Sequence, residues 1–548
     1  MQARSGRRRA RTTRSRTGCR TCRARRIKCD ETPGRCQNCK VAGWPCEGSD
    51  LTRLPGKATY GAQHATLLSS VAAQFPWPIT SDEKRCLSFL WHHLIPDSVV
   101  VSGVSDLFSP RNLIGQLSVV EPAVYHALVA LSAINHQVHD AGIAIPGQSL
   151  RSKWQHFALE QSLRAFTLLK HRPASQDPRL RQVILVCCLL FVLIELASAR
   201  YDDANTHLQA GLRILNEGAP SSLPIDPTLS DAFSYLESHS AFHGVHQPFR
   251  KLDAHFARLE TFETQLRPVR SVEQARQALN PLVPTIFRLL EQCWSLSKTD
   301  LARQYGVLQP KQQRLLSCLT HFRTYFDDIL TTYSHFTDRE RRSVDVVQLS
   351  VLTFTLSLKT CLHAPWDPAL HPLRPEFEDL MARTVALNDR LGTRPQFTPD
   401  GILCAALSFL ALRGPDYRIR LQAIAALRAS PRAEGYYNGL VVAEFAISGL
   451  KLELTQSMSG SIKHGTRGQR LQLDDLPYPQ DRIVEELLGL QQDEHLLGSI
   501  ATLQGASDWL SNQAGGQVQT ECSDVGGHQV WYLNTSNPRR VPWEEGDK

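Results

Sequence analysis

The sequence predicts two units of very different size: a small cysteine-rich domain near the N-terminus and a large all-α, multi-helix body. Six of the 14 cysteines lie within residues 19–46. From Ser81 onward, apolar residues recur at the three- and four-residue spacings of amphipathic helices, and the alternation of strands is nearly absent. The chain has 548 residues, more than one core usefully fills, so at least two units are expected.

Positive charge is concentrated at the N-terminus. Residues 1–50 hold 12 Arg and 2 Lys against 2 Asp and 2 Glu, a net +10, so the remaining 498 residues carry about −2 of the total +8. A basic head on a nearly neutral body predicts a polyanionic partner for the head alone. Residues 1–17 contain seven arginines and no acid. We expect a disordered basic arm that acts as a nuclear import signal, contacts phosphates, or does both. A mitochondrial transit peptide would need an apolar helical face, which this arm lacks.

The six cysteines of "GCRTCRARRIKCDETPGRCQNCKVAGWPC" (18–46) form an internal repeat. Their spacing is C-x2-C-x6-C-x6-C-x2-C-x6-C, at Cys19, Cys22, Cys29, Cys36, Cys39 and Cys46. Two tetrahedral zinc sites need eight sulfur positions, which six cysteines supply only if two of them bridge. Disulfides are disfavoured by the intracellular composition, and an iron–sulfur cluster needs only four thiolates. The pattern predicts one binuclear cluster that holds two zinc ions.

The two halves of the repeat differ in charge. Four of the six residues between the second and third cysteines are basic, namely Arg23, Arg25, Arg26 and Lys28, whereas the second half has only Lys40 there. Arginine grips guanine bidentately in the major groove, and lysine neutralises phosphate. The first half is therefore predicted to contact double-stranded DNA, and the second to pack. The alternative, that these cations only offset the thiolate charge, explains less well why all four lie on one helix.

This segment resembles the DNA-binding domain of the fungal zinc binuclear cluster transcription factors. The cysteine spacing, the basic run, Asp30 and Pro33 all agree with that family. The resemblance implies that the first and fourth cysteines, Cys19 and Cys36, bridge the two zinc ions. It also implies that Arg25 and Arg26 read a CGG-type triplet, although many members have Lys at the position of Arg26.

The predicted domains are a basic arm (1–17), the zinc cluster (18–47), a linker (48–80), a helical regulatory body (81–454) and a C-terminal region (455–548). The linker contains no convincing coiled coil, so a homodimer, if one forms, is expected to use the body. The first helix is predicted to be capped by Ser81, and another begins at Pro122. Further helices are expected at about 149–170, 178–199, 201–216, 274–297, 310–334, 345–361, 400–412 and 416–429.

The body carries weaker signals of function. Residues 125–137, 204–218 and 420–439 resemble the fungal-specific regulatory domain that follows the cluster in one branch of the family. No nucleotide-binding or hydrolase motif occurs, which argues against an enzyme. A metal site at His239, His243 and His246 is less consistent with the sequence than an ordinary histidine-rich turn. The longest apolar run, Val183–Ile194, is too short to span a bilayer, and no membrane partner is expected.

The C-terminal region begins with a predicted loop at 455–470. It leads to "LDDLPYPQDRIVEELLGL" (473–490), which is acidic and leucine-rich. Such segments can recruit the transcription machinery or co-regulators. The regular apolar spacing from Asp481 favours a docked helix, so the activation role stays the second interpretation.

These observations predict a nuclear, sequence-specific DNA-binding transcription factor of RNA polymerase II genes. The resemblance to this family implies a metabolic or secondary-metabolite gene set as its target. The alternatives are an enzyme or scaffold that carries a zinc-cluster nucleic-acid-binding head.

Overall fold

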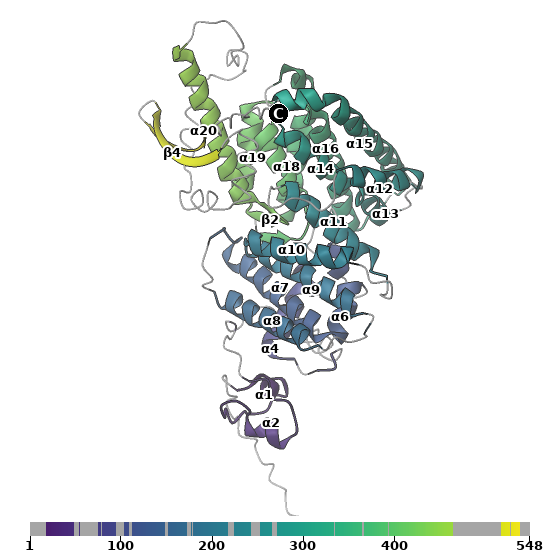
Figure 1. Ribbon diagram of the computed structural model, residues 1–548, viewed down its shortest axis with the longest axis vertical. Coiled ribbons are helices and arrows are strands. Elements are labelled where there is room, and N and C mark those ends of the chain that lie inside the picture. Colours follow the sequence, from purple (N-terminus) through teal and green to yellow (C-terminus); the bar gives the residue numbers. More distant parts are fainter. Residues whose placement is uncertain are drawn as a thin grey trace, which may run out of the picture.

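The computed structural model is a stack of helices along one long axis, with the cysteine-rich domain at one end (Figure 1). The predicted fold class is confirmed. The structure describes residues 18–48, 54, 75–77, 79–94, 104–108, 112–147, 152–172, 177, 179–217, 224–242, 252–265, 271–296, 298–333, 335–363, 367–392, 394–463, 517–525 and 528–536.

The small domain and the lower half of the body come first along the chain. The small domain has two short helices, α1 (Arg20–Ala24) and α2 (Gln37–Val41). The lower body comprises α4 (Ser81–Phe89), which continues as the π-helix η1 (Leu90–Leu94), then η2 (Ser105–Phe108), α6 (Leu113–Val120), α7 (Pro122–Ala141), α8 (Lys153–Lys170), α9 (Leu180–Ala197) and α10 (Tyr201–Asn216).

The upper half of the body holds the remaining helices. They are α11 (Pro227–Phe242), α12 (Leu252–Gln265), α13 (Val272–Leu279), α14 (Leu282–Ser295), α15 (Lys298–Thr332), α16 (Asp338–Thr360), the 3-10 helix η3 (Pro368–Leu373), α17 (Arg374–Leu391), α18 (Leu403–Arg413), α19 (Tyr417–Ala429) and α20 (Gly439–Lys463). One continuous apolar core runs through both halves of the body, and the cysteines of the small domain form a separate cluster.

Helix starts follow the capping rules. The N-cap of α4 is Thr80 rather than the predicted Ser81, because Glu83 stands three residues after Thr80 and closes a capping box, which Lys84 could not do for Ser81. Pro122 occupies the first turn of α7, as predicted.

Several predicted helices differ from the observed ones at their ends. The predicted helix 274–297 is two helices, because the chain breaks between Leu279 and Leu282 around Pro281. The predicted helix 310–334 starts earlier, since α15 runs through Pro310. Helix α20 continues to Lys463, so the loop predicted from 455 is wrong up to that residue. The predicted helix from Asp481 lies outside the described residues.

Two small sheets accompany the helices. In the first, β1 (Gln396–Thr398) pairs in parallel with β2 (Arg432–Glu434), and β2 pairs antiparallel with β3 (Tyr437–Asn438). In the second, β4 (Gln517–Val525) and β5 (His528–Ser536) form an antiparallel pair. The sequence did not predict these strands. Strands β1 to β3 have only two or three residues each, too few for a readable alternation. Strands β4 and β5 have nine residues each and lie in the C-terminal region, where no strand was expected.

Helix α9 is a long, strongly apolar helix. It has the length and composition of a membrane span, but 67% of it is buried inside the body, as in a core helix. The predicted twelve-residue apolar run is the centre of this helix. The later cysteines whose side chains are described are unbridged and mostly buried, as predicted for reduced core residues.

Candidate metal centre and nucleic-acid interface

The two halves of the cysteine repeat begin their helices in the same way. Cys19 caps α1, and its Sγ accepts a hydrogen bond from the Cys22 N–H at 3.3 Å. Cys36 caps α2, and its Sγ accepts from the Cys39 N–H at 3.4 Å. The C-x2-C spacing therefore places both sulfurs of each pair over the first turn of a short helix.

The third cysteine of each half closes back on the first. The Cys29 Sγ accepts from the Cys19 N–H at 3.3 Å, and the Cys46 Sγ accepts from the Cys36 N–H at 3.4 Å. Each half is thus a loop closed by an N–H···S bond, and the second half repeats the first seventeen residues later.

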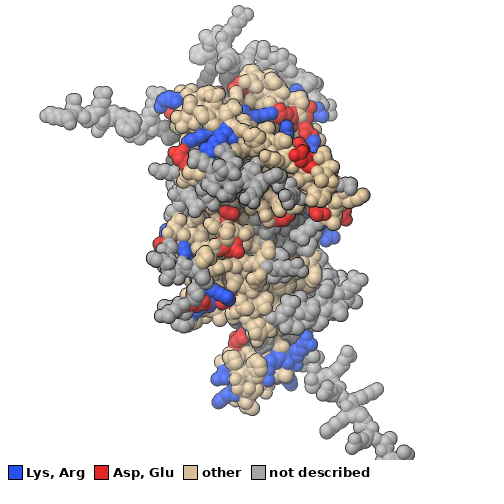
Figure 2. All heavy atoms as spheres, turned by 90° about the vertical axis from the view of Figure 1, so that its right-hand side faces the viewer, with Lys and Arg blue, Asp and Glu red and all other residues tan. Residues whose placement is uncertain are grey.

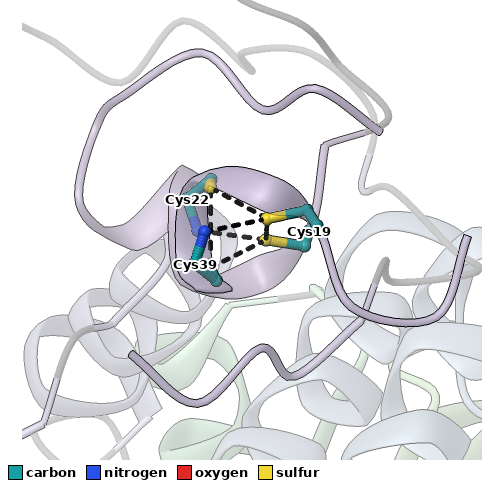
Figure 3. A group of neighbouring side chains, drawn as sticks. Cys19, Cys22 and Cys39 are labelled. Carbon is teal, nitrogen blue, oxygen red and sulfur yellow. Dashed lines mark hydrogen bonds between the residues drawn. The ribbon is translucent and has the colours of Figure 1, made fainter. Parts of the chain in front are cut away.

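The four sulfurs of the C-x2-C pairs converge on one point (Figure 3). The Sγ of Cys19 lies 3.6 Å from that of Cys36 and 3.7 Å from that of Cys39. The Sγ of Cys22 lies 3.6 Å and 3.7 Å from the same two atoms. Four sulfurs at about 2.3 Å from a tetrahedral zinc would be separated by about 3.8 Å. The donor type and its spacing therefore fit zinc.

Cys19 and Cys36 occupy the centre of the thiol group. Besides these contacts, both interact with the side chains of Cys29 and Cys46. Cys36 also belongs to a second group of potential ligand atoms, with Cys29 and Asp30. Two sulfurs that touch all the others are the arrangement a bridged binuclear site requires.

The electrostatics separate the central thiols from the outer ones. Burial raises the pKa of the Cys19 and Cys36 thiols above the ordinary value. Burial also acts to raise the pKa of Cys29 and Cys46, but the N–H groups that their sulfurs accept outweigh it and lower both pKa values. Zinc binds thiolates, and the N–H groups that donate to Cys29 and Cys46 favour the thiolate form of the outer pair.

Asp30 joins the two halves of the repeat. Its carboxylate accepts from the N–H groups of Gln37 at 2.9 Å and Asn38 at 3.0 Å, at the start of α2. The Asn38 amide in turn donates to the Lys28 carbonyl at 2.8 Å. The Thr32 hydroxyl and these N–H groups lower the pKa of Asp30, so it stays ionised. The carboxylate fixes the third cysteine of the first half against the helix of the second.

The four predicted DNA contacts lie in different surroundings. The expectation that all four share one helix is wrong, because α1 ends at Ala24 and contains only Arg23 of the four. Arg26 and Lys28 are exposed, and Arg25 is half-buried with its guanidinium 4.9 Å from the centre of the Trp44 ring. Arg23 instead donates to Asp82 of α4 at 3.3 Å and is 9% exposed. Basic side chains gather on the small domain in the space-filling view (Figure 2).

Arg26 has a backbone conformation that side chains rarely adopt. Its φ is 59°, and Gly43, seventeen residues later, has φ 70°. Both residues follow a short helix, and the bonds Ile27 N–H to Cys22 carbonyl and Arg26 N–H to Arg23 carbonyl form a Schellman motif. The second half of the repeat uses the usual glycine at this position, whereas the first half keeps an arginine at a cost of about 1–2 kcal/mol.

Sequence reasoning missed Arg20. This residue follows the first cysteine, is 3% exposed and forms a buried ion pair with Glu83 of α4. Arg20 contributes to the +10 charge of residues 1–50, for which a polyanionic partner is predicted, and nothing in the local sequence indicates a carboxylate partner 63 residues away.

Within the described residues, the groups suited to a metal are built from these cysteines and Asp30. His239 is buried, with its ring stacked on Phe287 and tilted against Tyr437. The other two histidines of the predicted turn lie outside the described residues.

Comparison with known families gives two matches. Residues 17–54 match the model of the fungal Zn(2)-Cys(6) binuclear cluster domain. Residues 102–401 match the model of the fungal specific transcription factor domain.

Curated relatives are similar at low identity. The chain is 24% identical over 400 residues, or 65% of its length, to an aspercryptin biosynthesis cluster-specific transcription regulator of Emericella nidulans, and this match covers 60% of the relative. It is 22% identical over 223 residues, or 40% of its length, to a transcription regulator of Purpureocillium lilacinum, of which 52% is covered. A segment of 43 residues is 56% identical to white-opaque regulator 2 of Candida albicans and covers 8% of this chain and 10% of that protein. No solved structure matches significantly.

Proposed function

The chain belongs to the fungal zinc-cluster transcription factors, whose members are transcription regulators rather than enzymes, and from this premise we propose that it reads CGG-type triplets in nuclear DNA. The observation that carries the proposal is Arg26, an exposed arginine held in a left-handed conformation at the end of a helix that the cysteines fix. A strained residue that persists points to a function.

Two zinc ions would be held by Cys19, Cys22, Cys29, Cys36, Cys39 and Cys46, with Cys19 and Cys36 shared. The metal would supply the positive charge that keeps the buried thiols ionised and the cross-links that a thirty-residue domain lacks. The Cys19 and Cys29 sulfurs accept N–H groups at the start of α1, and the backbone bonds from Arg26 and Ile27 fix its end. A fixed helix end aims a guanidinium reproducibly, which the basic arm at 1–17 cannot do.

The basic residues would divide the contacts with DNA. Arg26 is placed to donate to guanine O6 and N7 in the major groove, and the adjacent Lys28 to contact phosphate. Arg25 is stacked on Trp44, which limits its conformations and suits it to a base-edge or a sugar–phosphate contact. Arg23 would join them only after it leaves Asp82.

The target genes are inferred from the relatives. One similar protein is named for a biosynthesis cluster, so we propose that this chain regulates secondary-metabolite genes transcribed by RNA polymerase II. Residues 1–17 would act as a nuclear import arm and 48–80 as a linker. The body, 81–454, would contact the transcription machinery, co-regulators or a second copy, and 455–548 would hold any activation segment. Genome-wide mapping of bound sites tests the target set.

Substitution of Arg26 tests the reading mechanism. Arg26→Gly removes the side chain but suits the left-handed backbone, so the zinc cluster should keep its fold. Binding to a duplex with a CGG triplet should weaken by about 1–3 kcal/mol, and binding to a random duplex much less.

Lys40→Ala is the matched control, because Lys40 holds in the second half the place that Arg23 holds in the first and carries the same charge as Arg26. It should weaken both duplexes slightly and equally. If Arg26→Gly also lowered both affinities equally, Arg26 would be part of a charge patch and not a reader.

A further inference from the structure

The zinc cluster is docked on the first helix of the body. The Arg20 Nε donates to the Glu83 Oε1 at 2.9 Å, and the two side chains are 3% and 1% exposed. The other side of the Arg20 guanidinium contacts Glu47 of the cluster domain. In Figure 1, α1 lies directly beyond α4 at the end of the body. An ion pair this deeply buried fixes both elements against each other.

Glu83 is held from the body side as well. Its Oε2 accepts from the Thr80 N–H at 2.7 Å within the capping box of α4, and its Oε1 lies 4.0 Å from the His126 Nδ1 on α7. The carboxylate is therefore held by the backbone of its own helix as well as by Arg20. The start of α4, residues 80–83, is an acidic surface to which Arg20 of the zinc cluster binds.

The neighbouring ion pair, Arg23–Asp82, occupies one of the predicted DNA-binding arginines. The Arg23 Nη2 lies 3.3 Å from the Asp82 Oδ2, and both side chains are 9% exposed. Asp82 also lies 3.7 Å from Arg85 on its own helix. At this distance the Asp82 carboxylate is an anionic hydrogen-bond acceptor for Arg23, as a DNA phosphate would be.

Arg26, the proposed base-reading residue, has different surroundings from Arg23. Arg26 is exposed, and its charge adds to burial in lowering the pKa of Lys84 on α4. Lys84 of the same helix therefore offers Arg26 no ion pair of the kind that Asp82 offers Arg23. In the docked cluster Arg26 is exposed to a DNA base, whereas Arg23 is paired with Asp82 and cannot contact a phosphate.

We propose that the N-terminal turn of α4 is a docking surface for the zinc cluster, and that Asp82 competes with DNA phosphate for Arg23. This inference rests on the proposed DNA-binding function. Full engagement of DNA then requires Arg23 to exchange Asp82 for a phosphate. Anything that loosens α4 from the cluster raises the affinity for DNA.

Asp82→Asn in the zinc-loaded full chain tests the competition. Affinity for a CGG-containing duplex and for a random duplex is measured across a salt series. The variant should bind both several-fold more tightly at low salt, and its plot of log affinity against log salt should steepen by about 0.9, the value of one phosphate contact. Arg23→Ala alone should change little, and Arg23→Ala combined with Asp82→Asn should cancel the gain.

The controls separate this effect from general electrostatics. Asp379→Asn makes the same charge change and frees an arginine, Arg383, from an exposed pair on α17 at 2.9 Å. It should leave the affinity and the salt slope unchanged. A gain from Asp82→Asn that survives Arg23→Ala would come from Arg85 or from net charge and would overturn the proposal. An unchanged or weaker affinity of Asp82→Asn would do the same.

The test also distinguishes this inference from the proposed function. If the wild-type chain does not prefer the CGG duplex, the proposed function fails. If it does prefer that duplex, through Arg26, and Asp82→Asn changes nothing, only the competition fails. Circular dichroism of each variant checks that the helices are intact.

Discussion

His126 is a buried histidine at the junction between the body and the zinc cluster. It lies on α7, with its Nδ1 2.7 Å from the Gln161 Oε1 and 4.0 Å from Glu83. Burial lowers the pKa of His126 to about 4, with Arg20 adding to this and the Glu83 charge opposing it. The folded protein therefore keeps a neutral imidazole, although a carboxylate is near.

This shift predicts a pH dependence of stability. The unfolded histidine has a pKa of 6.5, so the unfolded chain binds more protons than the folded one between pH 6.5 and about 4. Stability is complete above pH 6.5 and falls as the pH drops, by roughly 3 kcal/mol in all. His126→Gln should lose less in thermal midpoint than wild type between pH 7.5 and pH 5. His156→Gln, at an exposed position on α8, should behave as wild type. Equal losses in all three chains would contradict the assignment.

At the level of single residues, the cysteines were predictable and the arginines only in part. Ligand spacing is a local property, so positions 19 to 46 could be assigned from the sequence. The left-handed conformation of Arg26 could not, because arginine gives no sign of positive φ, although the glycine at position 43 of the repeat was a readable hint. The pairing of Arg23 with Asp82 depends on how two units pack, which spacing does not encode.

Helices α10 and α11 approach each other closely at a glycine. A Cβ atom on Gly211 would lie 2.2 Å from the Phe233 ring, and Phe233 is fully buried. No side chain other than hydrogen fits between these two helices without movement of the ring. This contact lies in one of the segments that resemble the fungal regulatory domain, so the close approach explains a glycine inside a helix.

Gly211→Ala should therefore destabilise the body by about 1–3 kcal/mol, despite the better helix propensity of alanine. Gly306→Ala is the matched control, because Gly306 is exposed in α15 and its Cβ would meet no atom within 4 Å. It should stabilise the body by about 0.5–1 kcal/mol. Urea unfolding followed by circular dichroism measures both changes. Two changes of the same sign would contradict the packing argument.

Helix existence was predictable, and helix ends less so. The apolar periodicity found α7 to α10, although α7 and α9 are buried around most of their circumference. It did not find the break at Pro281 or the passage of α15 through Pro310, since a proline can start, end or interrupt a helix according to its tertiary contacts. Strand β1 pairs with β2 more than thirty positions later, so no local pattern could show that pairing. Strands β2 and β3 form a local hairpin, but they are too short for an alternation to be read.

The zinc cluster and the body form one contiguous molecule in the described residues. The sequence predicted a linker and, with it, independent units. That domain division stays a prediction, but the Arg20–Glu83 pair adds a contact that a linker alone does not require. The reason lies in tertiary packing: two charges 63 residues apart become partners only when the chain folds.

Metal removal tests how strongly the two units are coupled. A chelator should unfold residues 18–47, because their fold depends on the metal, while the helical signal of the body stays largely intact. The body should nevertheless lose the charged hydrogen bond to Glu83, worth about 1.5–3 kcal/mol, and its thermal midpoint should fall by a few degrees. Arg20→Ala should produce the same fall without chelator. An unchanged midpoint in both cases would show that the contact contributes nothing.

The docking surface at the start of α4, residues 80–83, also limits how this protein can be engineered. A chimeric regulator is made by joining a foreign DNA-binding domain to an existing regulatory domain through the linker. Here such a transplant would place whatever residue follows the first cysteine of the foreign domain against Glu83, which is 1% exposed in the docked state. A leucine or an acid there would leave a desolvated carboxylate without a cation, or expel the foreign domain from the junction. A working chimera should therefore have an arginine at the position of Arg20, or residues 80–83 should be exchanged together with the DNA-binding domain.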